Sequence, residues 1–149
     1  DIVETCPQAA PIIAEIATRI AAHGGAALIF DYGEWHSLGD TLQALRAHEF
    51  DDPLAHPGEA DLTAHVDFEA LATAAPGLAA LPVTPQGVFL ERLGITARAQ
   101  ALADKLSGTA LESHIAAHRR LTHPQEMGTL FKTLALLPQT APTPPGFAP

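Results

Sequence analysis

The 149-residue chain carries 8 lysine and arginine residues against 17 aspartate and glutamate residues, which gives a formal net charge of −9. Its length corresponds to one domain or part of a larger one, and its 47% hydrophobic and 17% charged residues exclude a disordered chain. The negative charge gives no electrostatic reason to bind nucleic acid or an anionic membrane surface, and no apolar run is long enough to span a bilayer.

The first predicted unit is a helix followed by a strand. Isoleucines recur at helical spacing and predict a helix over residues 7–23, which ends at Gly24 and Gly25. The apolar run 26–30 does not alternate with polar residues, which predicts a strand covered on both faces, as in a parallel α/β sheet.

The predicted strand is closed by Asp31, Tyr32 and Gly33. In open parallel sheets, ligands bind at the carboxyl ends of strands, so Asp31 and Tyr32 are candidate site residues. The alternative is a simple strand-to-loop turn in which Gly33 supplies a positive φ.

The segment 34–67 is polar and predicts a long functional loop with short extended pieces near 41–45 and 61–66. Within it, Asp61 and His65 can act as a carboxylate-oriented general base, with Thr63 between them. The alternative is local structure, because aspartate and threonine also bend and cap the backbone.

Asp67 predicts the N-cap of a short helix around residues 71–75. A strand over 78–84 follows, confined to an edge or a strand end by Pro82. Three helices (86–93, 96–106 and 109–121) and a last strand (130–137) complete the chain before a proline-rich tail, residues 138–149, which we expect to fray.

Motifs that would name an activity directly are absent from the sequence. It has no Gly-x-Ser-x-Gly, no phosphate loop and no Gly-x-Gly-x-x-Gly, and its single cysteine, Cys6, has no local histidine partner. His114 and His118 have the spacing of zinc ligands on a helix, but Ile115 replaces the expected glutamate and no third ligand is evident. We therefore expect solvated histidines and no metal site.

Three stretches together carry a family resemblance: residues 24–33, residues 39–44 (Gly-Asp-Thr-Leu-Gln-Ala), and residues 57–68 (Pro-Gly-Glu-Ala-Asp-Leu-Thr-Ala-His-Val-Asp-Phe). With Phe131 and Lys132 in the last strand, they resemble the MidA-like family of S-adenosylmethionine-dependent methyltransferases, relatives of the mitochondrial complex I assembly-factor arginine methyltransferase. The resemblance covers nearly the whole chain. It departs from the family at Glu34, where a histidine is frequent.

The resemblance implies an α/β fold, namely the C-terminal part of a Rossmann-like class I methyltransferase sheet with a helical insertion before the last strand. Residues 1–137 would be the C-terminal portion of one methyltransferase domain. Because the family's glycine-rich cofactor loop precedes the matched region, the residues that bind S-adenosylmethionine are unknown here. The chain begins at Asp1 and its only methionine is Met127, so we expect a piece of a longer protein.

The implied function is arginine-directed protein methylation. The substrate would be a protein, for example a subunit of respiratory complex I or a homologue of one. Carboxylates can orient the planar guanidinium. The candidate catalytic residues are Asp61, His65 and Asp31, and the candidate substrate-binding residues are Tyr32, Asp40, Asp67 and Thr63.

A non-catalytic protein-interaction domain that retains part of the fold is the alternative. The expected location is the bacterial cytoplasm, or the mitochondrial matrix in a eukaryote. We also expect one edge of the first strand to lack a neighbour in this chain, which favours self-association.

Overall fold

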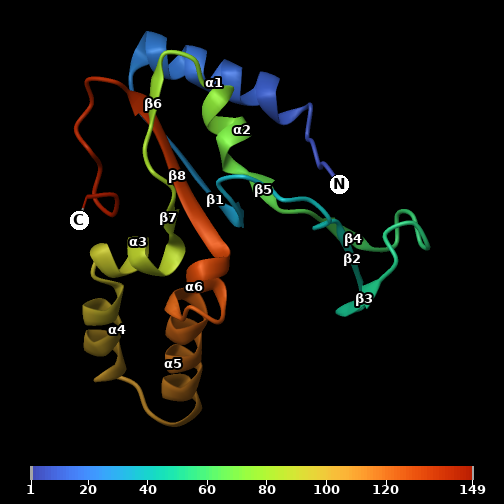
Figure 1. The fold of residues 1–149 in the computed structure, drawn as a ribbon. Helices are drawn as coiled ribbons and strands as arrows, with labels where there is room; N and C mark the ends of the chain where they lie inside the picture. The colour runs from blue at the N-terminus through green and yellow to red at the C-terminus, as the bar shows by residue number, and fades with distance from the viewer. Residues whose placement is uncertain (1, 149) are drawn as a thin grey trace.

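A computed structural model describes residues 2–148 of the chain, and its centre is a mixed β-sheet (Figure 1). The strand order is β5-β1-β8-β6, and β7 also pairs with β8. Strand β8 runs antiparallel to β1, β6 and β7, whereas β5 runs parallel to β1. The bounds are Ala27–Glu34 for β1, Val66–Asp67 for β5, Leu78–Ala80 for β6, Thr84–Pro85 for β7 and Phe131–Pro138 for β8.

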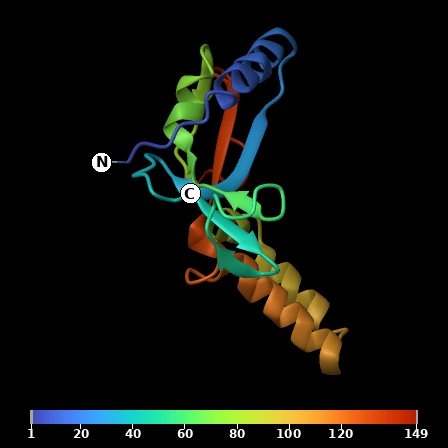
Figure 2. The same ribbon diagram turned by 90° about the vertical axis from the view of Figure 1, so that its right-hand side faces the viewer.

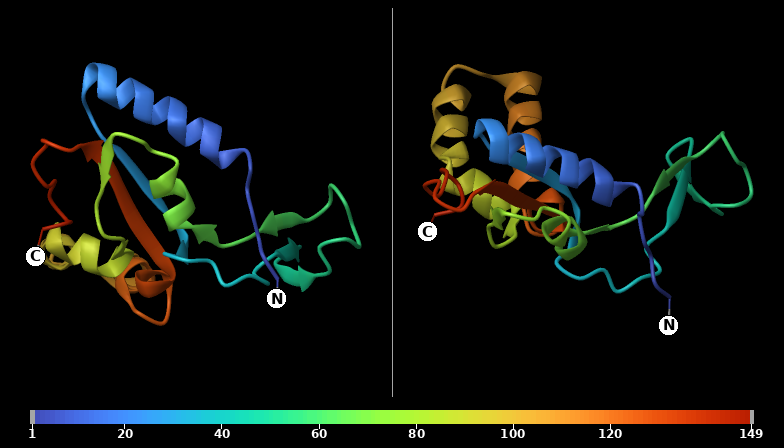
Figure 3. Two further views of the ribbon diagram at one scale, coloured as in Figure 1. Left: turned by 45° about the horizontal axis from the view of Figure 1, so that its top comes forward. Right: turned by 90° about the horizontal axis from the view of Figure 1, so that it is seen from above.

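Helices α1 (Ala9–His23) and α2 (Phe68–Thr73) lie along one face of this sheet (Figure 3). The predicted first helix is confirmed, and it ends where Gly24 adopts a φ of 74°. Its buried side chains recur about one turn apart, as a helix packed on one side requires. The core cluster consists of Ile13, Ala17, Phe68, Ala75, Leu134 and Leu136.

Strand β1 is longer and less covered than the sequence predicts. Ala27 and Ile29 pack against the core, whereas Leu28 and Phe30 on the other face are 47% and 42% exposed. The prediction that both faces are covered is therefore wrong for the described residues. The two edges of β1 also differ in how much of each is paired. Strand β8 pairs with residues 27–32 on one edge, whereas β5 pairs with only the last two residues of β1 on the other.

The polar segment between β1 and α2 forms a second, three-stranded sheet rather than a long loop. Strand β2 (Gln43–Arg46) pairs antiparallel with β3 (Glu49–Asp51) and with β4 (Asp61–Thr63). The extended pieces predicted near 41–45 and 61–66 are thus confirmed, but β3 was missed. This insertion sheet projects from the side of the main sheet (Figures 1 and 3).

The hairpin between β2 and β3 explains why β3 was missed. Its two turn residues, Ala47 and His48, adopt φ values of 52° and 68°. A two-residue hairpin turn needs positive φ, and asparagine or glycine is the usual sequence signal for it. Neither alanine nor histidine carries that signal.

The three predicted helices are confirmed as α3 (Gln86–Arg92), α4 (Ile95–Ala103) and α5 (Gly108–Thr122), and they precede the last strand as the resemblance implied. Helices α4 and α5 form a hairpin that projects from one end of the molecule (Figure 2). A fourth helix, α6 (Met127–Leu130), has only 4 residues and was not predicted. None of the helices in residues 2–148 is both long and apolar enough to cross a membrane.

The predicted strand over 78–84 is interrupted, and both of its parts, β6 and β7, pair with β8. The proline-rich tail packs against α3 instead of fraying. The Phe147 ring meets the Phe89 ring edge-on with the centroids 5.3 Å apart, and Gly146 is buried. The prediction of a frayed tail is therefore wrong as far as residue 148.

Candidate functional site

The candidate site lies at the carboxyl end of β1. The strand continues through Glu34, so Asp31 and Tyr32 lie within it, opposite Lys132 and Phe131 of β8, rather than in a loop after it. Both residues are half-buried. The Asp31 carboxylate accepts a hydrogen bond from the Tyr32 backbone N–H at 2.8 Å.

Gly33 allows β5 to approach this end of β1. A Cβ atom at Gly33 would lie 2.1 Å from the carbonyl oxygen of Val66, which no side chain permits. The glycine of the Asp-Tyr-Gly stretch thus serves a close approach of two strands. This approach brings the segment around His65 next to Tyr32.

Tyr32 and His65 are the two predicted site residues that the structure brings together. Their rings meet edge-on with the centroids 5.8 Å apart, and Tyr32 also meets Phe131 edge-on at 5.3 Å. His65 is half-buried and follows β4, where the chain turns into β5.

The predicted pairing of Asp61 with His65 does not form. Asp61 is exposed on β4 opposite Leu45, and no hydrogen bond joins it to His65 within residues 2–148. The reason is geometric, because Asp61 is fixed in the insertion sheet whereas His65 has already left that sheet. Thr63 lies half-buried on the same strand, and Asp40 is exposed in the loop before β2, at a φ of 52°.

Asp67 caps α2, as the sequence predicts. Its Oδ1 accepts the Ala70 backbone N–H at 2.9 Å, and its Oδ2 accepts the Ser37 backbone N–H at 3.3 Å. Both carboxylate oxygens are thus engaged with backbone. This geometry gives Asp67 a role in holding the loop after β1 against α2.

Replacing Asp67 by alanine is expected to lower the free energy of unfolding by about 0.5–2 kcal/mol, because the first turn of α2 loses its cap. The D67N variant is expected to keep most of the stability, since an asparagine oxygen also caps well. Urea unfolding of both variants measures this. Equal stability of D67A and the unchanged chain would contradict the assignment.

Other acid–base pairs form where the sequence analysis named none. His36 Nδ1 lies 2.7 Å from Glu69 Oε2, and His56 Nδ1 lies 2.8 Å from Asp51 Oδ2. The hydrogen bond from His56 lowers the pKa of Asp51 below its ordinary value. Both histidines are exposed, so each pair contributes little to the stability of the fold.

Lys132 and Glu34 form an ion pair at the candidate site that the sequence analysis also missed. Lys132 Nζ lies 2.8 Å from Glu34 Oε1 and donates to the Thr129 carbonyl oxygen at 2.8 Å. Lys132 is only 7% exposed, whereas the Glu34 side chain is 65% exposed. A lysine inside the apolar run of the last strand was the available signal, because a buried lysine requires a partner.

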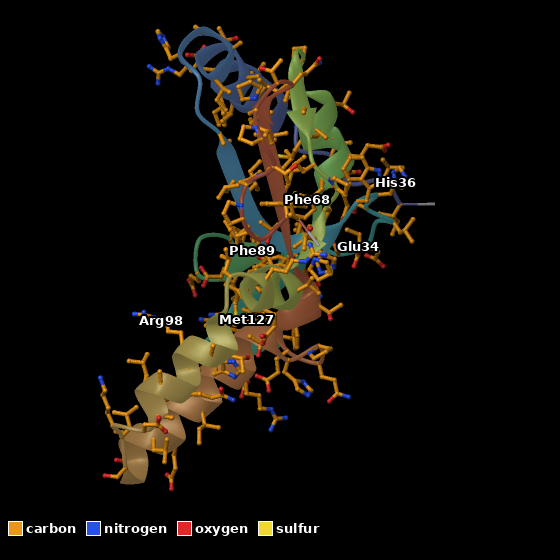
Figure 4. The ribbon with its side chains drawn as sticks, turned by 90° about the vertical axis from the view of Figure 1, so that its left-hand side faces the viewer. Glu34, His36, Phe68, Phe89, Arg98 and Met127 are labelled. Atoms are coloured by element: carbon orange, nitrogen blue, oxygen red, sulfur yellow. The ribbon has the colours of Figure 1, made fainter. Side chains whose placement is uncertain are left out.

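The two histidines with zinc-ligand spacing join helices instead. His114 Nε2 lies 2.9 Å from the Ala99 carbonyl oxygen, and His118 Nε2 lies 3.0 Å from Thr96 Oγ1. Both are half-buried, so the expectation of solvated histidines is wrong. Residues 2–148 contain no group of three potential metal ligands. The hairpin that carries Arg98 also lies far from Glu34 and His36 (Figure 4).

Comparison with known proteins identifies the family. The family described as "Putative S-adenosyl-L-methionine-dependent methyltransferase" matches residues 1–84, more than half of the chain. The chain belongs to this methyltransferase family.

Curated relatives of this methyltransferase segment are named protein arginine methyltransferase NDUFAF7, mitochondrial. The rat protein is 44% identical over 138 residues, which are 91% of this chain and 32% of that protein. The human protein is 41% identical over 140 residues, which are 93% of this chain and 32% of that protein. The chain thus spans about a third of the length of these relatives.

Two solved structures of one superfamily from Burkholderia thailandensis resemble this methyltransferase segment. The first has a TM-score of 0.79 at 29% identity, and the matched region covers 97% of this chain and 40% of that structure's chain. The second contains S-adenosyl-homocysteine and has a TM-score of 0.72 at 30% identity. The matched region covers 91% of this chain and 38% of that structure's chain. These matches confirm the expected Rossmann-like methyltransferase fold and the family's use of S-adenosylmethionine.

Proposed function

We propose that this chain is a segment of an arginine-directed protein methyltransferase and that it supplies the side of the active site that receives the methyl group. The observation that carries the proposal is the arrangement at the carboxyl end of β1. There, half-buried Tyr32 lies beside His65 and directly follows half-buried Asp31 on β1, in a family whose curated relatives are named arginine methyltransferases.

Methylation of an arginine side chain requires carboxylates that orient it and a group that accepts a proton from it. A guanidinium is a planar cation whose N–H groups donate to carboxylates in pairs, and Asp31, Asp40 and Asp61 supply carboxylates. When bound, S-adenosylmethionine supplies an activated methyl group on a sulfonium. The nitrogen that accepts a methyl group must lose a proton, for which His65 is the candidate acceptor. Most of the rate enhancement would come from positioning.

The cofactor's own side of the site is not formed by these residues. The sequence holds no glycine-rich turn between a strand and a helix that would let a backbone approach the cofactor. Two cavities, with volumes of about 230 and 200 Å³, lie on the α4–α5 hairpin, away from Asp31 and Tyr32. We therefore expect residues outside this segment to contribute to the binding of S-adenosylmethionine.

The 149-residue chain alone is expected not to bind S-adenosylmethionine with useful affinity, because the glycine-rich backbone contacts are missing. Titration calorimetry with S-adenosylmethionine and S-adenosyl-homocysteine measures this. The full-length methyltransferase serves as the positive control. Micromolar binding by the isolated chain would contradict the prediction.

The proposed substrate is a protein, and a respiratory complex I subunit or its homologue is the proposed example. The matrix of mitochondria or the bacterial cytoplasm is the corresponding location. The test is methylation by the full-length enzyme of lysate proteins from cells that lack it, followed by mass spectrometry of arginine-containing peptides. New dimethylarginine sites would support the proposal. If no such sites appear, the alternative of a non-catalytic interaction domain is favoured.

The isolated chain is also expected to self-associate. Residues 27–32 of β1 use one edge for β8 and have no strand on the other edge among the described residues, and Leu28 and Phe30 are partly exposed on one face of the same strand. Unpaired edges with apolar side chains favour association between chains. Analytical ultracentrifugation over a range of concentrations measures it. A stable monomer at high concentration would contradict this prediction.

A further inference from the structure

Glu4, in the segment that precedes α1, makes the side-chain hydrogen bonds that join this segment to the loop before β2. Its Oε1 accepts the backbone N–H groups of Thr41 at 2.7 Å and Leu42 at 2.8 Å, and its Oε2 accepts the Thr41 hydroxyl at 2.6 Å. One carboxylate thus binds two successive backbone amides and a hydroxyl. Hydrogen bonds to a charged acceptor are stronger than neutral ones.

Thr41 extends this contact to the candidate site. Its Oγ1 donates to Glu4 and at the same time accepts the His65 backbone N–H at 2.9 Å. The three groups therefore form a directed chain in which each hydrogen bond polarises the next. At the end of the chain, the His65 ring meets the Tyr32 ring edge-on.

The backbone just before Thr41 explains why an outside contact is needed. Asp40 adopts a left-handed φ of 52°, and a Cβ atom at Gly39 would lie 2.2 Å from the carbonyl oxygen of Ile2. Left-handed backbone costs free energy at any residue except glycine, although less at aspartate than at most, and neighbouring contacts help to hold it. The contacts of Glu4 and the close approach at Gly39 supply that support from the same N-terminal segment.

We propose that Glu4 is a positioning residue of the methyltransferase site, which fixes the His65 backbone through Thr41 and so holds the imidazole against Tyr32. The proposal rests on the proposed function in that it places His65 and Tyr32 at the site of methyl transfer. The Thr41 hydrogen bond lowers the pKa of Glu4 below its ordinary value of 4.5. The carboxylate is therefore charged, and able to accept all three bonds, at neutral pH.

The geometric part is tested by nuclear magnetic resonance on the 149-residue chain. E4Q replaces one acceptor oxygen by a donor, and T41V removes the hydroxyl, whereas T41S keeps it. E4Q and T41V are expected to speed amide hydrogen exchange at His65 roughly tenfold and to abolish the nuclear Overhauser effect between the Tyr32 and His65 rings. T41S is expected to retain both signals. E15Q is the matched control, because Glu15 is an exposed acid of α1 whose side chain pairs with the exposed Arg19.

The functional part uses the full-length methyltransferase. E4Q is expected to lower kcat about tenfold or more, as small misplacements of reacting groups do, without changing the KM for S-adenosylmethionine. T41S is expected to restore the kcat that T41V loses. Unchanged ring contact in E4Q and T41V would overturn the proposal, and so would lost contact with an unchanged kcat. Failure of the proposed function is distinguishable, because the unsubstituted enzyme would then methylate no arginine at all.

Discussion

Replacing Asp61 or His65 by alanine in the longer methyltransferase of which we propose this chain to be a segment is expected to reduce turnover at least about ten- to a hundred-fold, while the melting temperature changes little. For Asp61, loss of one charge-assisted contact to the proposed guanidinium corresponds to roughly 1.5–3 kcal/mol in the transition state. For His65, the loss is that of the proposed proton acceptor, and general-base catalysis contributes an effect of about a hundredfold or more. The effect on stability should be smaller. Asp61 is exposed on β4, and His65 is held through its backbone N–H, which alanine retains.

Glu49 provides the matched control for this experiment, because it is an exposed acid on β3 of the same insertion sheet. E49A should leave both turnover and melting temperature near those of the unchanged enzyme. Measuring both quantities on the same preparations separates a catalytic role from a structural one. Near-normal turnover with a lowered melting temperature would assign Asp61 and His65 to the architecture of the insertion alone.

Replacing Phe68 by alanine is expected to lower the free energy of unfolding by about 3–5 kcal/mol. Phe68 is 0% exposed and lies in the core cluster where α1, α2 and β8 meet. Removing its ring leaves a cavity that the surrounding side chains fill only in part. Urea unfolding followed by circular dichroism measures the loss.

Leu54 is the control for the Phe68 prediction, because it is 84% exposed in the loop between β3 and β4. L54A should change the free energy of unfolding by no more than about 0.5 kcal/mol. If F68A does not fold, F68L keeps an apolar side chain there and should show a smaller but measurable loss. A loss below about 1 kcal/mol for F68A would show that α2 contributes little to the core.

The sequence predicted those elements whose signals are local. Helix α1 follows from the spacing of its isoleucines, and its end follows from Gly24. The cap of α2 at Asp67 is also local, because its acceptor and donor are three residues apart. Helices α3, α4 and α5 were also predicted from local signals, because Gly94 and Gly108 mark the breaks between them.

The pairing of Asp61 with His65, which the residue pattern predicted, does not form in the folded chain. Asp61 and His65 are close in sequence, yet β4 holds Asp61 in the insertion sheet while the chain turns before His65. The contact that does form joins His65 to Tyr32, 33 residues apart by their numbering. Such a contact depends on how β5 approaches β1 at Gly33, which is a property of the folded chain.

The sequence by itself determined the family, the helices other than α6 and the place of the polar motif, because these depend on residue order and on periodicity over short distances. Only the tertiary structure decided which polar groups meet. The bonds from Glu4 to Thr41 and from Lys132 to Glu34 span 37 and 98 residues. No local pattern specifies such partners, since they are selected when the packing of α1 and β8 brings distant backbone together and buried charges require compensation.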